Sequence, residues 1–185
     1  YTTCPVTTRN NPGTLSIDTD IMTTYIENIF RGFFKHGVKG ILAINAHDGN
    51  IDPIQRASDR LFFEFPDSFI LSINWWETLP TPMIESMGLF SEGGGHGHGG
   101  PLETSSTWAV EPDSVSLSGA EDIDPSFNEQ EDLHILKSVG GLRKWPGYGG
   151  RISESSIEKG KILLRLAEDR IVELLEDWIQ KNPVN

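Results

Sequence analysis

Two short, unbroken apolar segments constrain the fold of this chain more than any other feature. Residues 40–45 read Gly-Ile-Leu-Ala-Ile-Asn, and residues 69–75 read Phe-Ile-Leu-Ser-Ile-Asn-Trp. Neither segment alternates apolar with polar side chains, so each is typical of a strand that is buried on both faces. Strands of this kind occur mainly in parallel sheets that are covered by helices. The two segments therefore predict an α/β fold with a mainly parallel sheet.

Helical patterns precede, separate and follow the two strands. Apolar residues recur at helical spacing up to residue 36, with Asp18 or Thr19 as the N-cap and Gly37 as the C-cap. Further helices are expected over about 51–63, 101–110 and 155–180, whereas residues 77–100 and 113–150 show little periodicity. The order helix, strand, helix, strand indicates βαβ-type units in a layered α/β fold.

Length and charge narrow the functional classes. The chain has 185 residues, which suits one domain over residues 1–185. Its net charge of -12, from 15 basic and 27 acidic residues, argues against partners such as nucleic acid or an anionic membrane. No apolar run reaches the roughly 20 residues of a membrane-spanning helix, and no signal peptide is visible. The single cysteine, Cys4, excludes an internal disulfide and a cysteine-rich zinc module, so a reducing, cytoplasmic location is expected.

The first candidate site is the segment Asn-Ala-His-Asp-Gly-Asn at residues 45–50, directly after the first predicted strand. Ligands of open α/β sheets bind outside the carboxyl ends of the strands. His47 is therefore placed to face a cleft, with Asn45 and Asn50 able to orient it or pin the loop. The alternative is a turn rich in Asn and Asp whose histidine is only solvated. The motif alone does not decide between the two.

The second candidate site is the segment His-Gly-His-Gly-Gly-Pro-Leu-Glu-Thr-Ser at residues 96–105. His98 and Glu103 lie five residues apart across a loop-to-helix junction, and both are ligand types that bind catalytic zinc and similar ions. The glycines let the backbone approach a ligand closely. The structural alternative is that Glu103 only stabilises the N-terminus of its helix. His96 is expected to fill the loop.

The remaining reactive or aromatic residues carry weaker predictions. Trp75 and Trp76 end the second strand, so they would point to opposite faces and only one of them would line a substrate pocket. His36 is expected to stabilise a helix end, and His134 to lie on the surface. Cys4 has no nearby base in the sequence, so a thiol nucleophile is not expected. Neither a Gly-x-Ser-x-Gly motif nor a phosphate-binding P-loop is present.

Taken together, four motifs resemble those of the creatininase family of metal-dependent amidohydrolases. Residues 45–50 match the family's Asn-Gly-His-Gly-Gly-Asn loop, and residues 98–105 match its His-Ala-Gly-x-x-Glu-Thr-Ser segment. Residues 11–16, Asn-Pro-Gly-Thr-Leu-Ser, are similar to its Pro-Gly-Thr-Ile-Ser segment. Residues 155–160, Ser-Ser-Ile-Glu-Lys-Gly, are similar to the start of its C-terminal helix. The motifs follow the family's order and extend over most of the chain.

The resemblance implies a three-layer α/β/α sandwich, often assembled as a homo-hexamer. It also implies two divalent metal ions per site (zinc, manganese or iron) that activate a bridging water. His47 would bind one metal, and Glu103 would bind the other or lie close to it, while His98 would carry a proton to the amide nitrogen. Asp48 replaces a glycine of the family's loop and adds a charge beside the site. We expect Asp48 and Trp76 to contact the substrate.

A second departure from the family is the absence of its earlier Glu-x-His-Gly-x-His-Leu-Pro segment and the Thr-Asp that follows it. These residues supply a Glu, a His and a bridging Asp to the metals. The chain also begins at Tyr1 without an initiator Met. We therefore expect the C-terminal two-thirds of a creatininase-like domain, with the missing ligands on a second polypeptide or on a removed N-terminal segment. A non-catalytic relative is the third explanation.

The leading hypothesis is an amidohydrolase that uses a metal-activated water to cleave a C–N bond in a small cyclic amide or a formamide. The first alternative is a non-catalytic binding or assembly subunit of a heteromeric enzyme. The second is a metal-dependent hydrolase of a keto-inositol or similar carbohydrate-like ring. Stoichiometric metal separates the first alternative from the enzyme hypotheses, and a substrate screen separates the second from amide hydrolysis.

Overall fold

The computed structural model describes residues 14–91, 93–123 and 147–182. Cys4, His134 and the Asn-Pro-Gly at residues 11–13 lie outside this part of the chain. The described residues fall into two compact units, Tyr1–Glu77 with Glu173–Asn185, and Thr78–Val172. None of the described helices is long and apolar enough to cross a membrane.

The first unit contains the predicted helix-strand-helix-strand order. Its elements are helix α1 (Thr19–Lys35), strand β1 (Gly40–Asn45), helix α2 (Ile51–Glu64), strand β2 (Phe69–Asn74) and the last turns of helix α5 (Ile157–Lys181). β1 and β2 pair in parallel, from Gly40 opposite Phe69 to Asn45 opposite Asn74. The parallel pairing predicted from the two apolar segments is confirmed.

Local signals at the two ends of α1 explain its bounds. The Oδ1 atom of Asp18 accepts a hydrogen bond from the backbone N–H of Asp20 at 3.0 Å, as an N-cap residue does. At the other end Gly37 adopts a φ of 86°, the left-handed conformation that ends many helices and that glycine adopts without strain. Asp18 was one of the two predicted N-cap residues, whereas the C-cap is His36, one residue before the predicted Gly37.

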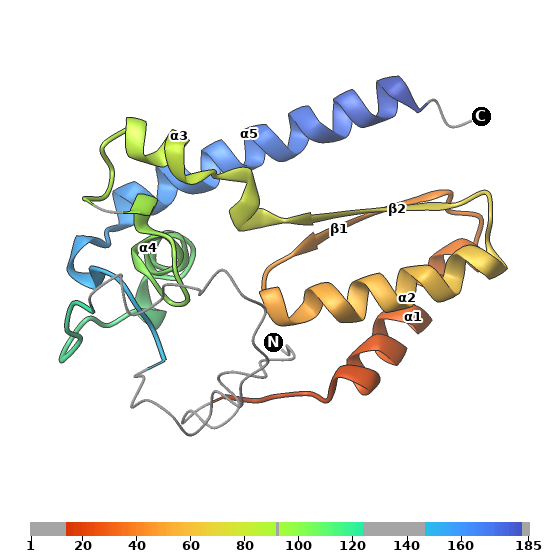
Figure 1. Cartoon of the computed structure of the whole chain (residues 1–185), viewed down its shortest axis with the longest axis horizontal. Helices are drawn as coiled ribbons and strands as arrows, with labels where there is room; N and C mark the ends of the chain where they lie inside the picture. The colour runs from red at the N-terminus through yellow and green to blue at the C-terminus, as the bar shows by residue number, and fades with distance from the viewer. Residues whose placement is uncertain (1–13, 92, 124–146, 183–185) are drawn as a thin grey trace, which may run out of the picture. The chain divides into compact units, whose positions relative to one another are not determined.

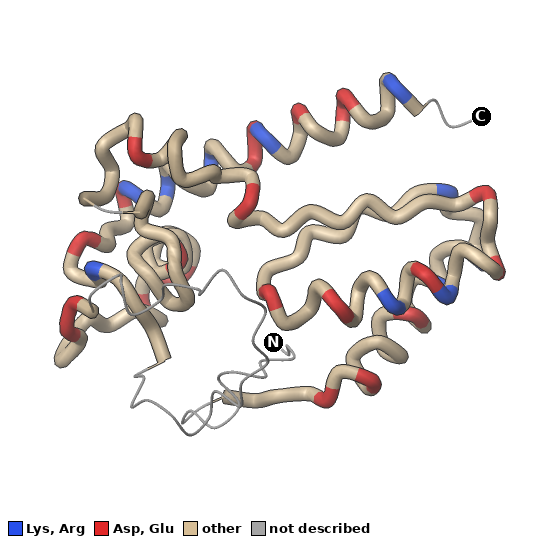
Figure 2. The backbone as a smooth tube through the Cα atoms, in the orientation of Figure 1, with Lys and Arg blue, Asp and Glu red and all other residues tan. Residues whose placement is uncertain are grey.

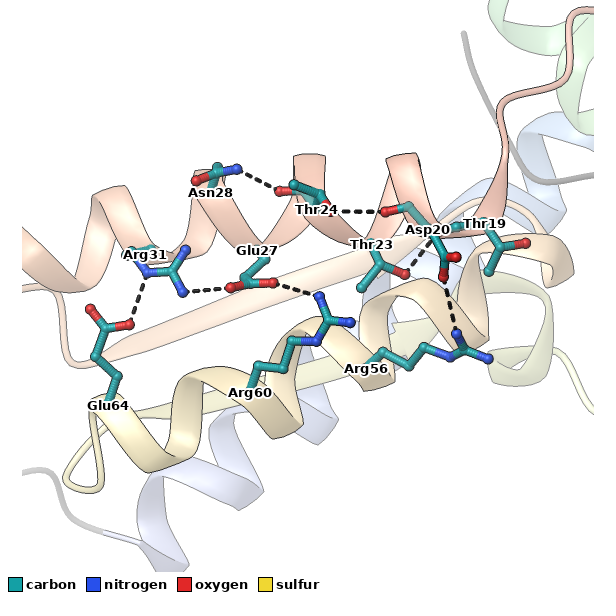
Figure 3. Close-up of polar contacts among 10 residues, drawn as sticks. All are labelled: Thr19, Asp20, Thr23, Thr24, Glu27, Asn28, Arg31, Arg56, Arg60 and Glu64. Carbon is teal, nitrogen blue, oxygen red and sulfur yellow. Dashed lines mark hydrogen bonds and ion pairs between the residues drawn. The ribbon is translucent and has the colours of Figure 1, made fainter.

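Helices cover both faces of the β1–β2 pair (Figure 1). On one face Phe30 and Phe34 of α1 and Leu61 of α2 form a core cluster, with Ile41 and Ile70 of the strands packed against it. On the other face the ring of Phe69 lies 4.1 Å from that of Trp178, between centroids. The first unit therefore has helix, sheet and helix layers, which confirms the predicted α/β/α class. Ion pairs also join α1 to α2, between Arg31 and Glu64 and between Arg60 and Glu27 (Figure 3).

A glycine makes room for this aromatic pair. A Cβ atom on Gly40 would lie 2.0 Å from the ring of Phe69, far closer than any real contact. Because Gly40 has no side chain, the Phe69 ring can lie against Gly40 and contact Trp178. The glycine at the start of the first apolar segment thus allows β2 to pack against α5.

The second unit contains α3 (Thr81–Ser86), α4 (Pro101–Val110) and the first turns of α5. The bounds predicted for α4 are confirmed. The sequence shows little periodicity over residues 77–100, yet this segment contains α3, in which Pro80 is the N-cap residue and Pro82 lies in the first turn. A proline in the first turn loses no helical hydrogen bond, since the N–H there has no partner within the helix.

Close contact between α4 and α5 organises the second unit. A Cβ on Gly160 would lie 1.9 Å from the carbonyl oxygen of Ser105, so only glycine allows this approach. The backbone N–H of Ser156 donates to the Oγ of Ser105 at 3.1 Å beside it. This contact gives a structural reason for the glycine in the Glu-Lys-Gly motif at residues 158–160.

Candidate active site

The carboxyl ends of β1 and β2 are joined by the side-chain amides of Asn45, which is buried, and Asn74, which is half-buried. Asn45 Nδ2 donates to Asn74 Oδ1 at 2.8 Å, and Asn45 Oδ1 accepts from the backbone N–H of His47 at 3.1 Å. Asn45 is only 3% exposed, so both of its bonds replace hydrogen bonds to water. The amide pair therefore fixes where the chain leaves the sheet and where the His47 loop begins.

His47 lies in an extended conformation directly before a 3-10 helix at Asp48–Asn50. Its Nδ1 atom is 3.0 Å from the backbone nitrogen of Gly49 and also 3.0 Å from Asp48 Oδ1. These neighbours favour different tautomers, since Gly49 donates to an unprotonated Nδ1 whereas the carboxylate accepts from a protonated one. In the second tautomer Nε2 is the basic nitrogen. A carboxylate that fixes this tautomer is a common partner of metal-binding histidines.

Asn50 contributes a buried atom whose hydrogen-bonding capacity is not used. Its Oδ1 atom is buried without a hydrogen-bond partner among the described residues. An unpaired buried carbonyl oxygen is costly, and a cation or a ligand donor would remove that cost. The donors on this loop, an imidazole nitrogen and an amide oxygen, fit the coordination chemistry of a divalent ion.

The second candidate segment forms a tight loop at the start of α4. Glu103 Oε2 accepts from the backbone N–H of Gly99 at 2.7 Å, and Thr104 Oγ1 donates to the Gly99 carbonyl at 3.1 Å. One carboxylate oxygen of Glu103 thus holds the loop that precedes α4. This resembles the structural alternative, in which Glu103 only stabilises the N-terminus of its helix. His98 is exposed, and its carbonyl accepts from Gly149 at 3.1 Å.

His96 and the two tryptophans have more definite places than the sequence indicated. His96 Nε2 lies 2.8 Å from the carbonyl oxygen of Leu79, so its ring anchors the glycine-rich loop to the start of α3. Trp75 and Trp76 are both half-buried and lie in a 3-10 helix, Trp75–Thr78. The strand ends at Asn74, so the expectation that it includes Trp75 was wrong, and the argument from alternating strand faces does not apply.

A complete metal site is not contained in the described residues. No group of three His, Cys, Asp or Glu side chains lies together in that part of the chain. His47 belongs to the first unit, whereas His98 and Glu103 belong to the second. The residues present fit a divalent ion as single ligands and do not make up a full set by themselves.

Asn74 is the residue of this region that sequence reasoning missed. Both strands end in Ile-Asn, at residues 44–45 and 73–74, and parallel pairing in register places the two asparagines side by side. The repeated Ile-Asn was therefore a usable signal. The two asparagines meet only in one register of the strands, and the sequence alone does not fix this register.

Comparisons with known proteins agree with this architecture. A family model described as Creatininase: Creatinine amidohydrolase matches residues 1–175. A creatinine amidohydrolase from Pseudomonas putida is 25% identical over 174 residues, which cover 90% of this chain and 66% of the relative. The chain thus spans just under two thirds of the length of that relative.

Solved creatininase structures have the same fold. A mutant creatininase of the Zn-Zn type matches with a TM-score of 0.77 and 23% identity, covering 99% of this chain and 72% of that one. The structure of creatininase Mn matches with a TM-score of 0.75 and 24% identity, covering 94% and 68%. Because the family model covers almost the whole sequence, the chain belongs to the creatininase family.

Proposed function

We propose that this protein is a metal-dependent amidohydrolase that cleaves a C–N bond in a small cyclic amide or a formamide. The observation that carries the proposal is the match of residues 1–175 to the creatinine amidohydrolase family model. The Pseudomonas putida relative is named for the hydrolysis of creatinine, which is a cyclic amide. Creatinine is therefore the first substrate to test.

The proposed cofactors are divalent metal ions, two per site, of zinc, manganese or iron. Two of the similar structures are described as Zn-Zn and Mn forms, which supports zinc and manganese. His47 would supply an imidazole nitrogen and Glu103 a carboxylate oxygen. Metal ions held by these residues would lower the pKa of a bound water and polarise the carbonyl of the substrate.

The remaining site residues would position the substrate and move a proton. We assign to His98 the transfer of a proton to the leaving nitrogen, because its exposed imidazole sits on a loop with glycine on both sides. Asp48, 3.0 Å from His47 Nδ1, would hold His47 in the tautomer whose Nε2 binds a metal. It would also contact a polar substrate. Trp76 would offer an aromatic wall to the substrate.

The proposed site needs ligands from outside this sequence. The coverage of 66% of the relative supports this part of the proposal, and the described residues hold no group of three His, Cys, Asp or Glu that could hold a metal ion. A second polypeptide or a further segment of the same protein would supply them, within an oligomer. The same observation favours one alternative, a non-catalytic assembly subunit, because such a subunit would need no complete ligand set.

The deciding experiment uses the protein as purified with everything that co-purifies with it. We expect native mass spectrometry and elemental analysis to find one to two metals per site, together with hydrolysis of creatinine or of another small amide. His98→Gln should retain the metal and lower kcat by at least about 100-fold. His36→Gln, a change at an exposed helix end, should alter neither. A wild-type complex without stoichiometric metal would support the assembly subunit instead.

A further inference from the structure

The loop that carries His98 has few means of fixing its own conformation. Residues 93–100, which we call the His98 loop, contain six glycines among eight residues. A glycine backbone has little conformational preference, and ordering it costs more entropy than ordering other residues. The conformation of the His98 loop therefore depends on contacts with other segments of the second unit.

The ring of Phe90 packs against the backbone of the His98 loop. Phe90 is only 6% exposed, and a Cβ atom on Gly95 would lie 2.5 Å from its ring. Gly95 also has a φ of 71°, which only glycine adopts without strain. The next residue, His96, is fixed by its ring, whose Nε2 lies 2.8 Å from the carbonyl oxygen of Leu79. The position of the Phe90 ring thus limits where the loop can lie.

Two charged residues near the start of α5 hold the segment that contains Phe90. The Glu154 carboxylate accepts two hydrogen bonds from Ser91, one from the backbone N–H at 2.8 Å and one from the hydroxyl. Lys159 Nζ lies 4.7 Å from the centroid of the Phe90 ring and donates to the Glu154 carbonyl oxygen at 2.7 Å. A cation over an aromatic face is attracted to the ring. We call Glu154 and Lys159 the α5 clamp.

The carboxylate of the clamp is charged at neutral pH. Burial raises the pKa of Glu154, but the side-chain and backbone hydrogen bonds from Ser91 outweigh it and hold this pKa below its ordinary value of 4.5. Both carboxylate oxygens are therefore unprotonated and accept hydrogen bonds. Each of them has a donor on Ser91.

Lys159 differs from other basic residues of its helix in where its contacts lie. Charged residues of both signs occur along α5 (Figure 2). Arg165 and Lys181 pair with carboxylates of the same helix, whereas the contacts of Lys159 reach beyond it. This gives a task to the lysine of the Glu-Lys-Gly motif at residues 158–160, which the proposed reaction does not use.

We propose that Glu154 and Lys159 are positioning residues for His98. By holding Phe90 and Ser91, the clamp keeps the His98 loop in one conformation and the His98 imidazole in one place. The task of His98 rests on the proposed function, whereas the contacts of the clamp do not. A group that moves a proton must stay within hydrogen-bond reach of its partner, so a loosened loop lowers the rate although no reacting group is lost.

Hydrogen exchange of the protein as purified tests the clamp without reference to activity. Lys159→Met removes the cation, and Glu154→Gln removes one of the two acceptors for Ser91. Each change should speed exchange at the His96 and Gly99 amides at least about threefold. These amides bond to the Gly93 carbonyl and to Glu103, so neither loses its own acceptor in the variants.

Matched controls lie on the same helix. Lys161→Met and Glu158→Gln are the same changes at exposed positions of α5, and they should leave exchange in the His98 loop as in wild type. Circular dichroism checks that each variant is folded. The two clamp variants alter different contacts, so either one tests the inference if the other does not fold.

Kinetics test the link to His98 in a protein that hydrolyses creatinine or another small amide. Lys159→Met should lower kcat about tenfold, with KM and metal content unchanged. Added to His98→Gln, the same change should cause no further loss, because a misplaced and a missing His98 fail in the same way. A loss that multiplies that of His98→Gln overturns the positioning role.

The outcomes separate this inference from the proposed function. Unchanged exchange at His96 and Gly99 in the clamp variants overturns the inference, whether or not the protein is an amidohydrolase. An active enzyme whose kcat the clamp variants leave intact also overturns it. Faster exchange in a protein that hydrolyses no amide supports the clamp and counts against the proposed function alone.

Discussion

At the scale of single residues, His47 illustrates how neighbours select the chemistry of a side chain. A carboxylate 3.0 Å from Nδ1 would favour protonation there and leave Nε2 as the basic nitrogen, whereas the backbone N–H of Gly49 favours an unprotonated Nδ1. The preceding Asn45 holds the backbone N–H of His47 from a buried position. Asp48 thus acts on the orientation of the ring, while Asn45 acts on the path of the chain.

The role of Asp48 leads to the first prediction. Asp48→Asn should weaken Zn²⁺ binding by roughly 10- to 100-fold, because the amide is a poorer acceptor for the Nδ1 proton. Isothermal titration with Zn²⁺ measures the affinity, and long-range ¹⁵N–¹H NMR reports the tautomer of His47. The control is Asp52→Asn, an exposed carboxylate four residues further on. Equal affinities for the two variants would rule out this role.

The amide pair of Asn45 and Asn74 leads to the second prediction. Asn45→Ala should lower the free energy of unfolding by about 1–3 kcal/mol, because it leaves Asn74 Oδ1 and the His47 N–H without their partner. Urea denaturation measures the change. Asn28→Ala is the control, since that amide is exposed and bonds only to the Thr24 carbonyl one turn away. A loss below about 0.5 kcal/mol for Asn45→Ala would contradict the argument.

At the scale of elements, two kinds of contact hold neighbouring helices together. Ion pairs join α1 to α2 along their exposed rim, as Figure 3 shows. Hydrogen bonds from Arg31 and then Arg60 hold the pKa of Glu27 below its ordinary value of 4.5. Between α4 and α5 the contact is instead steric, with the backbone of α5 touching that of α4 at Gly160.

The third prediction concerns the dependence of stability on pH. A carboxyl group with a lowered pKa in the folded state stabilises the fold above its unfolded pKa, and this stability is lost as pH falls through the folded pKa. The free energy of unfolding of wild type should therefore exceed that of Glu27→Gln by about 1 kcal/mol at pH 7. This difference should vanish below the pKa that Glu27 has in the folded state. Urea denaturation from pH 7 to 3 measures it. Glu168→Gln, on the exposed side of α5, should show no such trend.

The fourth prediction concerns the approach of α5 to α4. Gly160→Ala should lower the free energy of unfolding by about 1–3 kcal/mol, because the added methyl group overlaps the Ser105 carbonyl and forces the helices apart. The matched control is Lys161→Ala at the next, exposed position, with an expected change within about 0.5 kcal/mol. Thermal unfolding followed by circular dichroism compares the two. Equal melting temperatures would mean that the helices do not need this contact.

At the scale of the whole molecule, the candidate residues are divided between two compact units. His47 belongs to the first, and His98 and Glu103 belong to the second. A ligand that binds only the folded protein stabilises it by mass action. If His47 and Glu103 hold metal ions as proposed, metal binding stabilises the folded protein.

The fifth prediction follows from this linkage. Removal of metal with a chelator should lower the melting temperature by roughly 5–10 °C, the shift expected for a ligand present at about 100 times its Kd. Re-addition of Zn²⁺ or Mn²⁺ should restore the melting temperature in wild type and not in His47→Gln. Scanning calorimetry of the intact complex measures both. A melting temperature that is the same with and without chelator would count against a resident metal.

The sequence by itself determined the local elements and the donor types of this protein. The cap of α1 at Asp18, the apolar run of β1 and the proline start of α4 each depend on a few adjacent residues. Such signals are short-ranged, so they can be read without the fold. The family motifs likewise identified His47, His98 and Glu103 as candidates, and their roles remain predictions.

Only the tertiary structure decided which of these residues meet. The bond between Asn45 and Asn74 depends on the register of two strands separated by a helix, and the contact of Gly160 with Ser105 depends on how two helices cross. The first turn of α3 likewise needed its surroundings, because Pro80 and Pro82 are compatible with a loop or with a helix start. Contacts between distant segments arise from the packing of whole elements, a cooperative property that no short stretch of sequence contains.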